Sequence, residues 1–497
     1  MAGAALAIWG LNFGLPYLYR PDEDVLVGRS VRMAAEGSLD PLFANWPPLA
    51  FYILAAAEKL TGNLAAATLN DPSGAYLTGR ALSAAAFAAT IALVFVAARR
   101  AYGDLAAVIG AFALALSPLA VRQAHMATID FIQTMFAAAA MAAALAAAPA
   151  RAGAPARPIR AFAAAGALCG LAAAAKYTGG LAIVFVLAMA LQSTDRRRAV
   201  PASIIGAAVA FAIPLAVALL HPAAYAGGLA FLGGRGFEHG YGTPVGWIYH
   251  PTVSLPFGMG LGAYAMVIAG LVVAALKRTR ADRALLAFVA SYLLVVGASH
   301  EVFWRYVLPL LPALSMLAGG LSRAIPHRLR APAVPIALAL LLPSLWASLN
   351  TDRLLATADT RTQAAEWLME HAPAGSAIES AYYVSPFYDQ AMVDYNRRYV
   401  DDRLAAGFLQ GRYTTRFRLT MDDSVKDDTR TDADYVIAGS TPVGQRPPPQ
   451  LQGRPMLATF TPGRNGAVYD PIDAFYLPIW GFAGVQRPGP SIVIYGR

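Results

Sequence analysis

The sequence predicts a polytopic α-helical membrane protein, with about eleven transmembrane helices and a small C-terminal α/β domain outside the cytoplasm. Composition and apolar run length carry the membrane assignment. Of the 497 residues, 57% are apolar and only 14% are charged, whereas soluble proteins average about 25% charged residues. Apolar stretches such as 203–220 and 257–276 are long enough to cross a bilayer.

Basic residues alternate between dense and sparse loops, and this alternation predicts the orientation. Spans are expected at 2–19, 79–98, 104–120, 129–148, 161–175, 178–192, 199–220, 256–276, 283–299, 303–321 and 331–349. The dense loops contain Arg99, Arg100, Arg151, Arg157, Arg160, Arg196, Arg197, Arg198, Lys277, Arg278, Arg280, Arg283, Arg323, Arg328 and Arg330. The other short loops contain only Arg122, Lys176, Arg235 and Arg305. The positive-inside rule makes the dense loops cytoplasmic, so the first loop and the C-terminal region face outward.

The net charge of +9 would suggest a nucleic-acid partner in a soluble protein. Here most of the excess lies in short loops between spans, where it orients the protein in the membrane, so no nucleic-acid partner is predicted. The single cysteine, Cys169, lies in an apolar run, which excludes an intrachain disulfide and a cysteine metal site. The first span is expected to be a retained helix. It lacks the basic start of a signal peptide, and Trp9, Asn12 and Pro16 interrupt its apolar run.

The first outer loop, about 20–78, is expected to carry two short helices. Apolar and basic residues alternate over 23–37 in the manner of an amphipathic helix lying on a membrane. The chain then breaks at Trp46-Pro47-Pro48, and 49–60 forms a second interfacial or re-entrant helix. That second helix is too short to span a bilayer.

Residues 161–192 admit either one long helix or two short spans. A single helix would put the arginines of 151–160 and 196–198 on opposite sides, so two spans are preferred. A helix of about 15 residues rises only about 22 Å, less than the roughly 30 Å hydrocarbon core. The turn at 176–180 is therefore expected in a cavity below the outer surface. The alternative is a lysine that snorkels to the headgroups.

The texture of the sequence changes at about Asn350, where charges become frequent and apolar runs shorten. This predicts a transmembrane domain over 1–349 and an outer α/β domain over 350–497. Within the latter, a helix is expected at 360–371, strands at 377–384, 433–438 and 491–495, and a loop at 445–450. No internal repeat is evident.

Polar residues from distant segments are assigned to the outer side, where ionisable groups at membrane depth indicate function. They are Asp22, Glu23, Arg122, His125, Asp130, Lys176, Arg235, Glu238, His239, His300, Glu301, Arg305 and Tyr306. Structural alternatives stay open for several. Arg122 and His125 are equally consistent with interfacial residues, and His239 with a loop residue. Glu301 and Arg305 have the spacing of a helical ion pair.

The acidic run 22–24 is also consistent with a charged helix cap, but adjacent carboxylates at a membrane cavity suit proton abstraction. A carboxylate can take a proton from an acceptor hydroxyl, and lysine or arginine can stabilise a departing phosphate. Interfacial tyrosine and tryptophan can pack against a lipid tail or sugar ring. No glycine-rich phosphate loop follows a strand, which disfavours a nucleotide donor. A phosphate carried by a membrane lipid fits better.

The chain resembles the GT-C superfamily of membrane glycosyltransferases over nearly its whole length. It is most similar to lipid-carrier-dependent enzymes such as protein O-mannosyltransferases and the aminoarabinose or galacturonic-acid transferases of lipid A. The resemblance rests on Asp22-Glu23, on 37–54 with Trp46-Pro47-Pro48-Leu49, on Asp130, on Lys176-Tyr177-Thr178-Gly179, and on Arg305-Tyr306-Val307-Leu308-Pro309-Leu310-Leu311-Pro312. An acidic pair alone is a weak motif. The resemblance depends on the order and spacing of these motifs and on their shared side of the membrane.

The resemblance implies an inverting transfer of a sugar from a polyprenyl-phosphate donor to a hydroxyl of a lipid, glycan or protein. It makes Asp22 the general base, with Glu23 and Asp130 orienting it or sharing a divalent cation such as Mg or Mn. It assigns the donor phosphate or lipid to Lys176, Tyr177, Arg305, Tyr306 and Arg29. Acceptor or sugar contacts would come from Arg122, His125, Glu238, His239, His300, Glu301 and Trp46. The expected location is the bacterial inner membrane, with the site facing outside.

Two departures argue against copying the donor or metal site of the lipid A enzymes. Asn45-Trp46 stands where those enzymes commonly have Glu-Lys, and Val25 stands where they have an arginine. A transporter or flippase for a lipid-linked sugar remains the alternative function, although transporters often show inverted repeats and midplane charges. A non-catalytic receptor would leave the buried acids unexplained.

Overall fold

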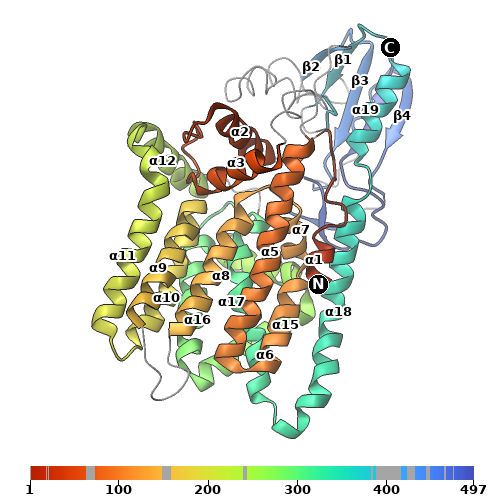
Figure 1. Cartoon of the computed structure of the whole chain (residues 1–497). Helices are drawn as coiled ribbons and strands as arrows, with labels where there is room; N and C mark the ends of the chain where they lie inside the picture. Colours follow the sequence, from red (N-terminus) through yellow and green to blue (C-terminus); the bar gives the residue numbers. More distant parts are fainter. Residues whose placement is uncertain are drawn as a thin grey trace. The chain divides into compact units, whose positions relative to one another are not determined.

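The computed structural model describes residues 2–17, 19–20, 22–62, 73–147, 158–238, 243–381, 384–387, 416–421, 431–443, 448–463, 466–473 and 475–497. The chain divides into two compact units (Figure 1). The helical unit comprises Met1–Ile8, Leu39–Ile53 and Arg80–Leu349, and the mixed unit comprises Trp9–Ser38, Leu54–Gly79 and Asn350–Arg497. The boundary between the two units after Leu349 coincides with the change in sequence composition at about Asn350.

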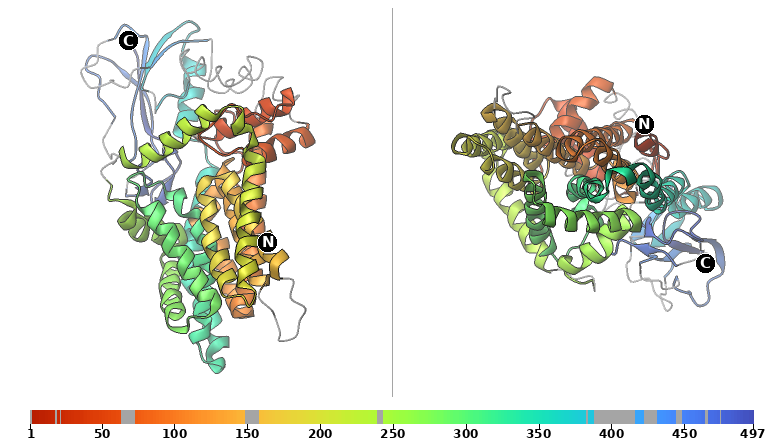
Figure 2. Two further views of the ribbon diagram at one scale, coloured as in Figure 1. Left: turned by 90° about the vertical axis from the view of Figure 1, so that its left-hand side faces the viewer. Right: turned by 90° about the horizontal axis from the view of Figure 1, so that it is seen from below.

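The helical unit is a bundle whose longer helices run roughly parallel to one another (Figure 2). Its elements are α1 (Ala2–Leu6), α5 (Ser73–Tyr102), α6 (Asp104–Ala115), α7 (Pro118–Ala124), α8 (Ile129–Ala147), α9 (Pro158–Ala175), η1 (Tyr177–Ala182), α10 (Ile183–Leu191), α11 (Arg196–Leu215), η2 (Ala216–Leu219), α12 (Pro222–Glu238), α13 (Gly246–Tyr249), η3 (His250–Ser254), α14 (Leu255–Met259), α15 (Leu261–Lys277), α16 (Arg280–Gly297), η4 (Trp304–Leu310), α17 (Leu311–Gly320), η5 (Leu321–Ala324), η6 (His327–Leu329) and α18 (Arg330–Leu355).

Within the described residues, five helices are long and apolar enough to cross a membrane, or six if the bent pair α6–α7 forms one span. Three shorter apolar helices cover Ile159–Ala175, Tyr177–Leu191 and Leu261–Lys277. The polytopic helical class is therefore confirmed, but the number of eleven spans is not. The two short helices on either side of the turn at Lys176 agree with the preferred interpretation of 161–192.

The expected first span, 2–19, is not a continuous helix. Helix α1 ends at Leu6, and the described residues that follow form turns as far as Tyr17. Gly10 and Gly14 have φ of 88° and 62°, outside the right-handed helical region. The expected span at 256–276 is likewise interrupted, because Gly260 has φ of 85° and separates α14 from α15.

Small residues bring α9 and α11 close together. A Cβ at Gly166 would meet the carbonyl oxygen of Ser203, and a Cβ at Gly170 would meet that of Ala207. Membrane helices associate closely where small residues let their backbones approach. Helix α9 also packs on α8. Its contacts with α11 and α8 therefore help to fix α8 and the turn that follows α9.

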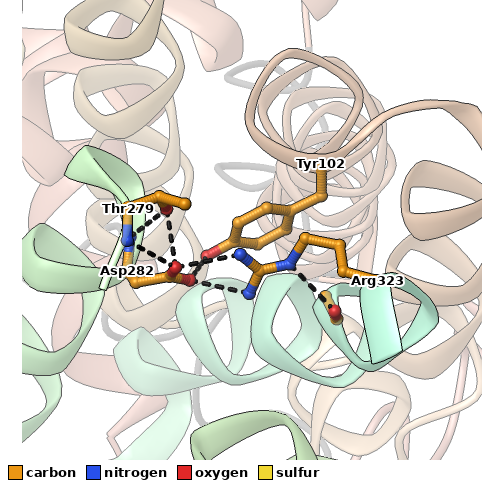
Figure 3. Close-up of polar contacts among 5 residues, drawn as sticks. Tyr102, Thr279, Asp282 and Arg323 are labelled. Atoms are coloured by element: carbon orange, nitrogen blue, oxygen red, sulfur yellow. Dashed lines mark hydrogen bonds and ion pairs between the residues drawn. The ribbon is translucent and has the colours of Figure 1, made fainter. Parts of the chain in front are cut away.

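A buried carboxylate joins three helices at one end of the bundle (Figure 3). The Asp282 side chain is fully buried and accepts hydrogen bonds from both terminal nitrogens of Arg323 at 2.9 and 2.7 Å. It also accepts from Tyr102 Oη at 2.7 Å and from Thr279 Oγ1 at 2.6 Å. Breaking one partner of such a buried pair is costly, so the network fixes α5, α16 and η5 together.

The mixed unit contains α2 (Glu23–Glu36), α19 (Thr360–His371) and a five-stranded sheet in the order β2-β1-β3-β7-β4. The strands are β1 (Ala377–Ser380), β2 (Arg418–Met421), β3 (Tyr435–Ser440), β4 (Met456–Phe460) and β7 (Ser491–Tyr495), beside a small pair of β5 (Val468–Tyr469) and β6 (Pro478–Trp480). Strands β2, β1 and β3 are parallel, and β7 is antiparallel to β3 and β4. Leu368 of α19 packs on Ile437 and Ile492 of the sheet.

The predicted helices at 23–37, 49–60 and 360–371 are confirmed as α2, α3 (Leu49–Thr61) and α19. The strand at 491–495 is confirmed as β7. The expected strand at 377–384 ends at Ser380, and β3 extends to Ser440. Part of the expected loop at 445–450 lies outside the described residues.

Candidate active site

Asp130 and Lys176 form a close ion pair in the helical unit. Asp130 is the second residue of α8 and is only 4% exposed. Lys176 caps the start of η1, and its Nζ donates to Asp130 Oδ1 at 2.7 Å. Its side chain keeps 21% of its accessible surface, so the ammonium remains reachable. The structure thus joins two of the sequence-predicted residues directly.

The turn that carries Lys176 is tight because of its glycines. Lys176 N–H donates to the carbonyl of Ala172, and Gly179 N–H donates to the carbonyl of Lys176 at 2.8 Å. A Cβ at Gly179 would clash with the carbonyl oxygen of Ala172 and lie 2.8 Å from Gln133 Cγ. Gly179 therefore lets η1 fold back against α9 and α8, which places the lysine beside Asp130.

Residues of η4 cover the same ion pair. Lys176 Nζ lies 5.1 Å from the ring centroid of Tyr306, a cation–π distance. The neighbouring Arg305 guanidinium lies 4.4 Å from the ring centroid of Phe303, and its charge also acts on Asp130. The structure therefore brings Asp130, Lys176, Arg305 and Tyr306 together, and their roles in a reaction stay a prediction.

Polar residues that the sequence analysis missed hold this cluster in place. Gln133 Nε2 donates to Thr178 Oγ1 at 3.1 Å, which links α8 to the lysine turn. Tyr292 Oη donates to the carbonyl of Tyr306 at 3.0 Å, which links α16 to η4. Gln133 lies one helical turn after Asp130 and was therefore detectable from spacing. Tyr292 lies inside an apolar span and gave no such signal.

Arg122 of α7 and His125, which caps the C-terminal end of α7, are both buried. The Arg122 guanidinium is 5.5 Å from the ring centroid of Trp304, whose Nε1 donates to the carbonyl of Ser254. His125 is fully buried, with Nδ1 2.8 Å from the carbonyl oxygen of Val121. A carbonyl only accepts, so Nδ1 carries the proton. Both residues are buried within the helical unit.

Asp22 and Glu23 begin helix α2 in the mixed unit. Asp22 is the N-cap residue and has φ of 73°, an uncommon conformation outside glycine. Glu23 is 1% exposed, whereas Asp24 is exposed. The positive end of the helix dipole stabilises the negative charges of Asp22 and Glu23. Arg29, one of the expected phosphate contacts, is buried in the same helix at 3% exposure.

The remaining predicted contacts have varied environments. The Trp46 ring contacts two aromatic side chains. Its centroid lies 5.2 Å from that of Phe43, in an edge-on arrangement, and 6.2 Å from that of Phe51, in a stacked one. His300 is exposed, and Glu301 is 4% exposed. Glu301 precedes η4, which begins at Trp304, so it is not one helical turn from Arg305 as the spacing suggested. Glu238 ends α12, and His239 lies outside the described residues.

Within each unit, the described His, Cys, Asp and Glu side chains form no group of three able to hold a metal ion. The Asp130 carboxylate is already paired with an ammonium at 2.7 Å. These residues do not fit a metal held by several protein carboxylates.

The chain is similar to known proteins in part of its sequence and in its fold. Residues 45–221 match the family model of dolichyl-phosphate-mannose-protein mannosyltransferases. The fold is similar to the crystal structure of ArnT from Cupriavidus metallidurans bound to undecaprenyl phosphate, with 17% identity, a TM-score of 0.54, and coverage of 82% of this chain and 75% of that one.

The fold is also similar to the oligosaccharyltransferase of Archaeoglobus fulgidus tethered to an acceptor peptide, with 13% identity and a TM-score of 0.52. That match covers 88% of this chain and 68% of the other. No curated protein sequence matches the chain significantly. The family model and the shared fold confirm the resemblance to GT-C glycosyltransferases.

Proposed function

We propose that this GT-C chain transfers a sugar from a polyprenyl-phosphate donor to an acceptor hydroxyl at the outer face of the bacterial inner membrane. The observation that carries the proposal is the largely buried ion pair of Lys176 and Asp130, with Arg305 and Tyr306 beside it. The solved ArnT structure with the same fold is bound to undecaprenyl phosphate, which supports a lipid-phosphate donor.

The charges of the cluster suit such a donor. Lys176 and Arg305 are cations and Asp130 is an anion, so the three carry one net positive charge. A sugar phosphodiester brings one negative charge. When the sugar leaves, the polyprenyl monophosphate gains further negative charge. Lys176 and Arg305 then stabilise the departing group more strongly than the intact donor, which is the requirement for catalysis.

Asp22 acts in this scheme as the general base. Its carboxylate takes the proton from the acceptor hydroxyl. The acceptor oxygen attacks the anomeric carbon with inversion while the bond to the phosphate oxygen breaks, and that electron pair leaves with polyprenyl phosphate. Glu23 orients Asp22 or the acceptor. Asp130 is a positioning residue, since it holds Lys176 by the hydrogen bond at 2.7 Å.

The proposal places the transmembrane catalytic domain at 1–349 and an outer α/β domain at 350–497, as the loop charges and the sequence texture favour. The acceptor is a lipid, glycan or protein hydroxyl. The acceptor peptide in the oligosaccharyltransferase of similar fold supports a macromolecular acceptor.

The test separates transfer from transport. The purified chain in proteoliposomes is given labelled polyprenyl-phosphate sugars together with lipid, glycan and peptide acceptors. Transfer releases one free polyprenyl phosphate for each sugar moved to an acceptor. A labelled donor that crosses the bilayer intact, with no polyprenyl phosphate released, would instead establish the transporter alternative.

A further inference from the structure

A second polar cluster lies in the helical unit beside the lysine turn and is not part of the site described above. Asp40 Oδ2 is 2.6 Å from His221 Nε2. Asp40 Oδ1 accepts from the N–H of Leu42 at 2.8 Å, which fixes the carboxylate in its turn. The carboxylate is 19% exposed and the imidazole 45% exposed, so a ligand can reach both groups.

The first turns of α12 direct one helical face toward this carboxylate. Tyr225 N–H donates to the carbonyl of His221, so the two side chains lie one turn apart on one face. Gly228 continues that face, and a Cβ there would lie 2.8 Å from the carbonyl carbon of Ala44. His221, Tyr225 and Gly228 therefore all face the segment that contains Asp40 and Trp46.

Tyr225 supplies a buried hydroxyl with unused hydrogen-bonding capacity. The residue is 7% exposed, and its Oη has no hydrogen-bond partner among the described residues. Burial raises the pKa of Tyr225, and the nearby Tyr52, Tyr177 and Asp40 raise it further. The hydroxyl therefore stays neutral and able to donate. Buried polar groups without a partner are rare in native proteins and call for a ligand or water.

Aromatic side chains complete the surroundings. Tyr177 belongs to the lysine turn, and its ring centroid is 6.5 Å from that of Phe211. Tyr52 is anchored by a hydrogen bond from its Oη to the carbonyl of Pro214 at 3.2 Å. A carboxylate, an imidazole and neutral phenols beside aromatic faces suit the hydroxyls and C–H faces of a sugar ring. The carboxylate disfavours a phosphate here, in contrast to Lys176.

We propose that Asp40, His221 and Tyr225 form a sugar-binding subsite next to the lysine turn, with the Asp40 carboxylate accepting from sugar hydroxyls and Tyr225 Oη donating to one. The inference rests on the proposed glycosyl transfer and names residues that select its carbohydrate. The sugar ring can come from the donor or from a glycan acceptor, because both present the same hydroxyl chemistry.

The test uses saturation-transfer NMR on the full-length chain in nanodiscs, with methyl glycosides of glucose, galactose, mannose and arabinose as probes. Tyr225→Phe and Asp40→Asn should weaken binding of the preferred glycoside by about tenfold, the loss expected for one net hydrogen bond at the upper end of its range. Tyr264→Phe and Asp104→Asn are matched controls elsewhere in the unit and should bind as the parent does.

Binding unchanged in Tyr225→Phe and Asp40→Asn would overturn the subsite, as would a parent protein that binds none of the glycosides. Undecaprenyl phosphate binding by the same samples reports on the proposed function separately. If lipid binding is retained while glycoside binding is absent or is unchanged in the variants, the subsite is disproved and the donor assignment stands. Glycoside binding that depends on Tyr225, without lipid binding, removes the donor assignment instead.

Kinetics of the active enzyme distinguish the two sources of the sugar. A donor subsite requires that Tyr225→Phe raise the KM for the lipid-phosphate sugar with little change in the KM for the acceptor. An acceptor subsite requires the reverse. A variant in which neither KM changes would contradict the proposal.

Discussion

At the scale of single residues, the pair of Asp130 and Lys176 carries both structural and functional weight. A carboxylate that is 4% exposed would be strongly destabilising without a partner. Lys176 removes that cost through its hydrogen bond at 2.7 Å, yet keeps 21% of its side-chain surface. The lysine therefore compensates a buried charge and also remains available to a phosphate.

Replacing Lys176 should separate these two contributions. Lys176→Ala takes the ammonium away from the buried Asp130 and leaves Arg305 as the nearby cation, so it should lower stability by about 3 kcal/mol, the lower end of the range for broken buried pairs. Lys176→Arg keeps the charge and should lose less of both stability and lipid binding. The double variant Lys176→Met with Asp130→Asn should recover stability but still bind undecaprenyl phosphate poorly. Thermal unfolding and lipid binding measure these effects, and a double variant that binds lipid normally would exclude Lys176 as the phosphate contact.

Asp22 is predicted to be the catalytic base. Asp22→Asn should reduce turnover by about 10²-fold or more, the usual contribution of a general base, and leave folding intact. Asp24→Asn changes an exposed neighbour in the same helix and is the matched control. Turnover by the purified variants is the measurement, and a normal rate in Asp22→Asn would remove this residue from the mechanism.

At the scale of secondary-structure elements, the lysine turn shows how backbone geometry sets the site. Lys176 can reach Asp130 only because η1 packs tightly on α9, and Gly179 makes that approach sterically possible. Hydrogen bonds from Gln133 and Tyr292 then tie α8, η1, η4 and α16 to one another. The site is thus held by short, irregular elements between longer helices.

A methyl group at Gly179 should damage the site selectively. The added Cβ would clash with the Ala172 carbonyl and with Gln133, so the turn must move away from α8. Gly180→Ala is the control, since its Cβ would lie 3.2 Å from Ala173 Cβ, a contact that small shifts relieve. Transfer activity should fall at least tenfold more in Gly179→Ala than in Gly180→Ala. Equal activities would show that the close turn is not required.

Local patterns predicted the elements whose signals are local. The amphipathic helix α2, the helix α19 and the strand β7 match their predicted ranges closely. The span at 2–19 failed because hydropathy does not report the left-handed conformations of Gly10 and Gly14. Strand β4 was missed because it lies at the edge of the sheet with mostly exposed side chains, so it lacks the buried apolar pattern that marks β7.

The candidate site was predictable in its residue types but not in its pairings. Loop charge placed Asp130 and Lys176 on one side of the membrane, and the structure shows that they touch. Helical spacing also suggested that Glu301 and Arg305 lie one turn apart on a helix, but η4 begins only at Trp304, so Glu301 precedes it. Contacts between residues of distant segments depend on helix packing that one sequence does not reveal.

At the scale of the whole molecule, the account depends on sidedness. The distribution of lysine and arginine predicts that the lysine turn and the C-terminal domain share the outer side. Nucleotide sugars are not normally supplied there, whereas a lipid-linked donor reaches the site through the bilayer. The same sidedness would suit acceptors that are assembled outside the cytoplasm.

Cysteine labelling tests this orientation. Cys169 is buried and is replaced by alanine to give a cysteine-free background. Gln452→Cys, at an exposed position of the mixed unit, should react with an impermeant maleimide in intact cells. Thr194→Cys, in a predicted cytoplasmic loop, should react only after lysis. The opposite pattern would invert the topology and place the site in the cytoplasm.

The most direct test of the central claim is a structure of the full chain with undecaprenyl phosphate. We expect phosphate density within hydrogen-bonding distance of Lys176 Nζ, beside Arg305, with the prenyl chain leaving toward the lipid. The Asp130 carboxylate should remain in contact with the lysine. Phosphate density at another site, with Lys176 and Asp130 unchanged and remote from it, would contradict the assignment of this cluster as the donor site.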